Sequence, residues 1–69
     1  MTSQQSQEAL SIIQAINKAR SLEEVQACTD YFADWLEESD INVSPKLGLY
    51  IGAKDLATTR AKERICGIA

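Results

Sequence analysis

The sequence predicts an all-α protein, a compact domain of three helices that takes up residues 1–69. Three segments repeat apolar residues at the three- and four-residue spacing of a helix, and two of them begin with helix start signals. The chain has 69 residues, of which 45% are hydrophobic. That is enough for one small core and too much for a disordered protein. We therefore expect helices over about 3–18, 22–38 and 45–66.

The first predicted helix, residues 3–18, is amphipathic. Glutamines occupy one side, and the first turn is rich in serine and glutamine, so we expect that turn to fray. The apolar residues fall on a single stripe: Ala9, Ile12, Ile13, Ile16 and Ala19.

The second predicted helix, residues 22–38, has the clearest start. Ser21 and Glu24 fit a capping box, in which the serine hydroxyl accepts from the backbone N–H of Glu24 and the glutamate side chain reaches back. One face of this helix is apolar: Val25, Cys28, Phe32, Trp35 and Leu36.

The third predicted helix, residues 45–66, is ambiguous. Ser44 and Pro45 form a start signal, but Gly48 and Gly52 each weaken a helix by roughly 1 kcal/mol against alanine. Apolar residues alternate over 47–51, which leaves a short strand as an alternative, although a lone strand has no partner in so small a chain. We prefer a helix, either broken or bent near Gly52, with Gly67 as a left-handed C-cap.

The apolar residues of this third segment spread over more than half of the helix circumference. A helix of that kind is either central in its domain or buries a second side in an oligomer. We expect the segment to be the most deeply buried of the three, and we expect a homodimer.

Charge is distributed unevenly along the chain. Seven carboxylates and no base lie between Glu23 and Asp40, although the formal net charge is only −3. Asp30/Asp34 and Asp34/Glu38 are like-charged pairs four residues apart, which destabilise a helix by a few tenths of a kcal/mol. The acids are predicted to form a stripe opposite the apolar face. Such a stripe is either a solvated surface or a docking face for a basic partner.

Two aromatic residues, Tyr31 and Trp35, border the acidic stripe. They are either margin residues of the core or aromatic anchors of an interface. The predicted partner-binding residues are Glu23, Asp30, Tyr31, Asp34, Trp35, Glu37 and Glu38.

The third helix is basic, and its bases are Lys54, Arg60, Lys62 and Arg64. We expect them to form ion pairs with the acids of the second helix, within one chain or across a dimer. A DNA-reading helix-turn-helix is the competing interpretation. There the acidic helix would have to cross the phosphate backbone, which would repel it.

Composition argues against catalysis. The chain has no histidine, no glycine-rich nucleotide-binding pattern and no clustered metal ligands. We expect no enzyme activity, no catalytic residue, no cofactor and no metal, and we expect Cys28 and Cys66 to be reduced thiols. The acidity disfavours direct nucleic-acid and membrane binding. With no basic, apolar stretch at the start of the sequence we expect no signal peptide, and a cytoplasmic location.

These observations predict a small, non-enzymatic interaction module, a regulator or inhibitor. It would dock its acidic second helix on a basic protein such as a nucleic-acid-binding protein, as suits a phage or mobile-element accessory protein. The alternative is an assembly module, in which the charges of the second and third helices drive self-association.

Overall fold

The computed structural model describes residues 2–39 and 45–67, which form three α-helices. These are α1 (Ser3–Lys18), α2 (Leu22–Ser39) and α3 (Pro45–Cys66). The predicted three-helix, all-α fold is confirmed. Helix α3 runs without a break through 47–51 and Gly52, so the alternative of a strand is wrong and the helix is not interrupted there. The predicted cap at Ser44 and the acid at Asp40 lie outside the described residues.

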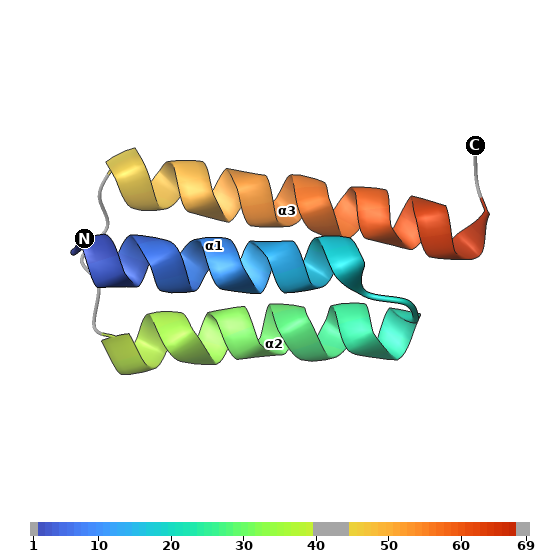
Figure 1. Ribbon diagram of the computed structural model, residues 1–69, viewed down its shortest axis with the longest axis horizontal. Coiled ribbons are helices and arrows are strands. Elements are labelled where there is room, and N and C mark those ends of the chain that lie inside the picture. Colours follow the sequence, from blue (N-terminus) through green and yellow to red (C-terminus); the bar gives the residue numbers. More distant parts are fainter. Residues whose placement is uncertain (1, 40–44, 68–69) are drawn as a thin grey trace.

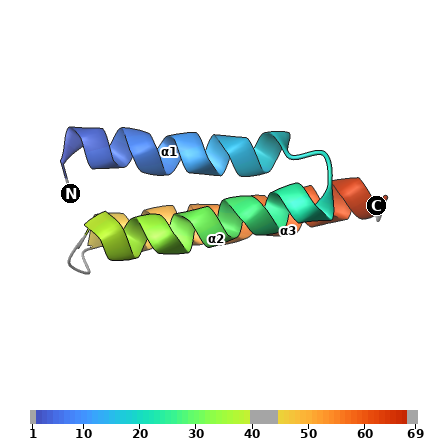
Figure 2. The same cartoon turned by 90° about the horizontal axis from the view of Figure 1, so that it is seen from below.

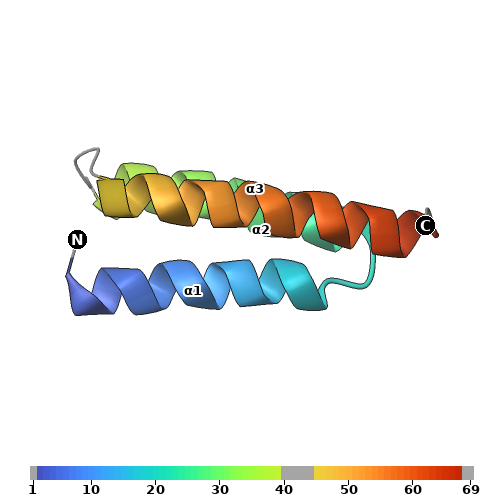
Figure 3. The same ribbon diagram turned by 90° about the horizontal axis from the view of Figure 1, so that it is seen from above.

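The helices form an elongated bundle of 36 × 19 × 15 Å. Helices α1 and α3 run in the same direction, and α2 runs in the opposite direction (Figure 1). The views turned by 90° place α1 on one level and α2 with α3 on another (Figures 2 and 3). Each helix packs against both of the others. The bundle is therefore triangular in cross-section, and each helix keeps one outer side.

The core is built from the predicted stripes of α1 and α2. Ile16, Val25 and Phe32 are its largest fully buried side chains. Burying such a side chain stabilises the fold by about 1.5–3 kcal/mol relative to leaving it exposed. Four of the five residues of the α1 stripe are buried within the helix, and the fifth, Ala19, is buried just after it.

Helix α3 is not the most deeply buried helix, and that prediction is wrong for the single chain. Three of its 22 residues are buried, against four of 16 in α1. The apolar residues of α3 lie on opposite sides, so one side cannot reach the core. Leu47 and two alanines face inward, whereas Leu49 is 75% exposed and Leu56 is 51% exposed.

Side-chain caps fix the helix starts. The Ser21 hydroxyl accepts from the Glu24 N–H at 3.1 Å, as predicted, but Glu24 reaches back to the N–H of Arg20 at 2.7 Å. A second capping box links Thr2 and Gln5 through two hydrogen bonds of 2.9 and 3.1 Å. The first turn of α1 is therefore capped rather than open. At the other end of the chain Gly67 has φ 71°, which confirms the left-handed C-cap.

Two long-range hydrogen bonds tie the helices together. The Trp35 Nε1 donates to Glu8 Oε2 at 2.7 Å and joins α2 to α1. The Arg64 Nη2 donates to the carbonyl oxygen of Ala19 at 2.8 Å and joins the end of α3 to the C-terminal cap of α1. Both bonds are partly buried, so they hold the helices in register at two different levels of the bundle.

Candidate protein-binding face on helix α2

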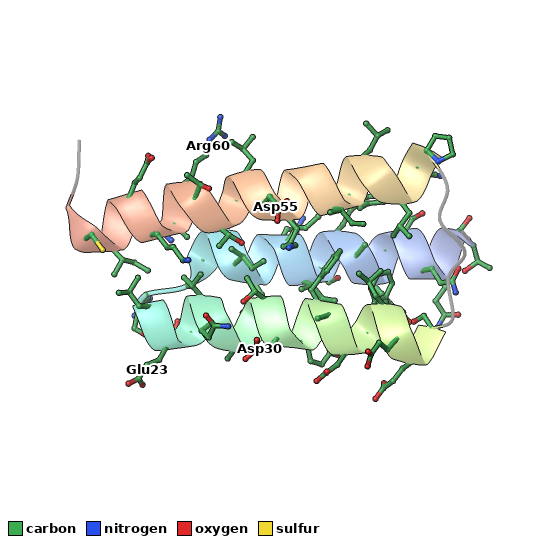
Figure 4. The ribbon with its side chains drawn as sticks, turned by 180° about the vertical axis from the view of Figure 1, so that it is seen from behind. Glu23, Asp30, Asp55 and Arg60 are labelled. Carbon is green, nitrogen blue, oxygen red and sulfur yellow. The ribbon has the colours of Figure 1, made fainter. Side chains whose placement is uncertain are left out.

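The outer side of α2 carries acidic residues from its first turn to its last. Because Val25, Phe32 and Trp35 turn inward, the helix periodicity directs the acids outward. Figure 4 shows Glu23 pointing away from the bundle, with Asp30 on the same helix. All of the predicted acidic residues are exposed, and we call them the α2 acidic face: Glu23, Asp30, Asp34, Glu37 and Glu38.

In the part of the chain that the structure describes, no basic side chain neutralises the α2 acidic face. Among residues 2–39 and 45–67 the only ion pair joins Lys54 to its neighbour Asp55, at 2.7 Å on α3. Asp30 accepts a hydrogen bond from the neutral Gln26 amide at 2.9 Å. Within the described residues the carboxylates of this face therefore form no ion pair, and they remain exposed to a cation supplied from outside.

The bases of α3 do not pair with the acids of α2 in the described part of the chain, so the ion pairs predicted within one chain do not form there. Lys54 lies over the Phe32 ring, 5.7 Å from its centroid, and Arg64 bonds the Ala19 carbonyl. Arg60 points away from the bundle on the side opposite to Glu23 (Figure 4). The α3 bases are spread around the helix, and so they cannot all face α2.

The two aromatic residues of the predicted site have different positions. The Trp35 side chain is in the core: it is 8% exposed, its ring centroid lies 5.5 Å from that of Phe32, and its N–H is bonded to Glu8. Of the two interpretations given for Trp35, a residue at the margin of the core or an interface anchor, its burial supports the first. Tyr31 is 62% exposed and borders the acidic face. Tyr31 is thus the exposed aromatic residue beside the acidic face, whereas Trp35 contributes only to the lining of the neighbouring groove.

An open groove runs beside the acidic face, between α1 and α2. Small side chains contribute to its lining, among them Ser11, Ala15 and Ala27, together with the half-buried Cys28. Its borders are polar and acidic: Gln4, Gln7, Glu8, Tyr31 and Glu38. Sequence reasoning missed the groove because it requires knowing how α1 pairs with α2. The small residues in both helices were the available signal.

In the described residues no three or more His, Cys, Asp or Glu side chains come together in a group that could hold a metal ion. Cys28 and Cys66 are free thiols. Within the same residues, none of the helices has the length and hydropathy needed to cross a membrane.

Comparison with known proteins gave no match, whether with family models, curated proteins or solved structures.

Proposed function

We propose that this protein is a non-enzymatic interaction module that binds a basic protein surface through the α2 acidic face. Its action is that of a regulator or inhibitor: it covers a cationic surface that a nucleic acid or another acidic ligand would otherwise occupy. The binding residues are the five acids of the face and Tyr31. Recognition would rest on charge complementarity, which raises association rates and excludes partners whose surface is negatively charged.

One observation supports this proposal most strongly: five exposed carboxylates share one helix side with no described base beside them. A helix surface that serves only for solubility gains stability from opposite charges four residues apart. Here Asp30/Asp34 and Asp34/Glu38 repel one another instead. The unfavourable energy is small, and a cationic partner would turn it into a favourable one.

The proposal is tested by reversing Asp30 and Asp34 to lysine. The wild-type protein, immobilised, captures partners from a native lysate at low salt, and the captured protein is then purified and titrated calorimetrically. We expect the Asp30→Lys/Asp34→Lys variant to bind at least about tenfold more weakly, a loss of about 1.4 kcal/mol. Salt should weaken the wild-type complex, since exposed charges are screened beyond about 8 Å at physiological ionic strength.

The matched control is Asp55→Lys/Glu63→Lys. Both double variants change the formal net charge from −3 to +1, but the control places its new bases on α3. Equal loss of binding in the two variants would show that net charge matters and the face does not. Capture of acidic rather than basic proteins would also contradict the proposal.

A further inference from the structure

The outer side of α3 carries a second exposed surface, which is apolar with a basic border. At roughly 100° per residue, Leu49 and Leu56 lie about 20° apart and almost opposite the buried side of the helix. They are 75% and 51% exposed. Lys46 and Arg60, both exposed, follow the same edge of this side, and Figure 4 shows Arg60 pointing away from the bundle. We call these four residues the α3 outer face.

We propose that the α3 outer face of one molecule docks into the α1–α2 groove of a second copy, beside its α2 acidic face. The two surfaces are complementary. One supplies two leucines and two bases, and the other supplies a groove lined partly by small side chains and bordered by carboxylates. This inference goes beyond the proposed function and does not depend on it.

The basic edge of the α3 outer face fixes a direction for the docked helix. Lys46 and Arg60 are 14 residues apart, and so are Glu23 and Glu37. With α3 of the second copy parallel to α2, both bases face α2, and one register brings Lys46 level with Glu23 and Arg60 level with Glu37. In the reverse direction the helix periodicity turns the basic edge toward the glutamines of α1 instead.

The same register seats the leucines. When Lys46 of the second copy is level with Glu23, its Leu49 lies within one residue of Ala27. Its Leu56 lies midway between Tyr31 and Trp35. Across the groove, the Glu8–Trp35 hydrogen bond fixes the level of α1, so that Ser11 and Ala15 border the same stretch. Leu49 thus faces the small side chains of Ala27 and Ala15, and Leu56 lies beside the two aromatic rings, opposite Ser11.

A symmetric pairing of two α3 outer faces fits less well. In such a pair the two α3 helices run antiparallel and cross the two-fold axis between Leu49 and Leu56. The axis places the two basic edges side by side, so that Lys46 meets Arg60 of the second copy. Like charges across an interface are unfavourable.

The groove and the α3 outer face lie on opposite sides of the bundle, so the proposed contact is head-to-tail and continues as a ring or an open chain.

The test uses sedimentation velocity on the free protein at low salt. We expect the average mass of the wild type to rise with concentration and to fall when salt is added. Leu49→Gln/Leu56→Gln and Glu23→Lys/Glu37→Lys should each be monomeric. Mixed, these two variants should form a 1:1 heterodimer that grows no further, because one intact α3 outer face meets one intact groove. Leu10→Gln, which removes an exposed leucine from α1, should associate like the wild type.

Circular dichroism of each variant shows whether it is folded, and an unfolded variant is replaced by Lys46→Gln/Arg60→Gln or Glu23→Gln/Glu37→Gln. A wild type that stays monomeric at all concentrations overturns the inference. So does a Glu23→Lys/Glu37→Lys variant that still associates by itself, which would indicate symmetric contact between α3 helices. Partner capture by Leu49→Gln/Leu56→Gln separates this inference from the proposed function, because that variant keeps its α2 acidic face.

Discussion

The hydrogen bond between Trp35 and Glu8 gives a sharp prediction about stability. In Glu8→Ala the indole N–H, in a side chain that is 8% exposed, loses its described acceptor. Hydrogen bonds to charged groups contribute about 1.5–3 kcal/mol, and a buried donor without a partner costs about 1–3 kcal/mol. Because the bond is only partly buried, we expect a loss of about 1.5 kcal/mol in the free energy of unfolding. In Glu8→Gln the side-chain carbonyl can still accept, and the loss should be about half as large.

Urea unfolding followed by circular dichroism at 222 nm measures the effect on a monomeric sample. For a domain of this size about 1.5 kcal/mol corresponds to a decrease in Tm of roughly 6–12 °C. Gln14→Ala is the matched control, because it also introduces an alanine, with its high helix propensity, but at an exposed position of α1. The reasoning is refuted if Glu8→Ala and Gln14→Ala have equal stability, or if Glu8→Gln is as unstable as Glu8→Ala.

Three further stability predictions use the same urea and thermal measurements. Phe32→Ala, at a side chain that is 1% exposed, should cost about 3–5 kcal/mol. That is a large part of the roughly 3–10 kcal/mol expected for 69 residues, so the urea midpoint should fall far below that of the wild type; a cooperative transition near the wild-type midpoint would contradict this. Ser21→Ala removes the α2 cap and should lower stability by about 1 kcal/mol, whereas an unchanged midpoint would mean that the cap contributes nothing. Gly48→Ala and Gly52→Ala should each raise stability by about 0.5–1 kcal/mol, because a Cβ at either position meets nothing within 4 Å; a decrease would show that these glycines are needed.

The helices could be predicted from the sequence because their signals are local. Periodicity and the Ser21–Glu24 cap depend on residues within a few positions of each other, and the structure places the three helices where those signals put them. The cap at Thr2 was also readable, since Thr2 and Gln5 have the capping-box spacing. It was missed because the serines and glutamines around it indicated a frayed end.

The candidate site was predictable only in part, because its remaining features depend on helix pairing. The exposure of the five acids follows from periodicity in α2 alone. The acceptor of the Trp35 N–H is Glu8, which is 27 residues away in the sequence. The outward position of Leu49 depends on which side of α3 meets the core. The sequence of α3 alone does not indicate which of its two apolar sides is buried.

Trp35 also has a practical consequence, because it is the only tryptophan in the chain and it lines the α1–α2 groove. Whatever enters that groove changes the surroundings of the one indole that dominates the fluorescence of the protein. A segment that seats itself there should shift the emission of Trp35, whereas a ligand that contacts only the outer acids should leave it unchanged. The unlabelled protein thus reports which of its two neighbouring surfaces is occupied.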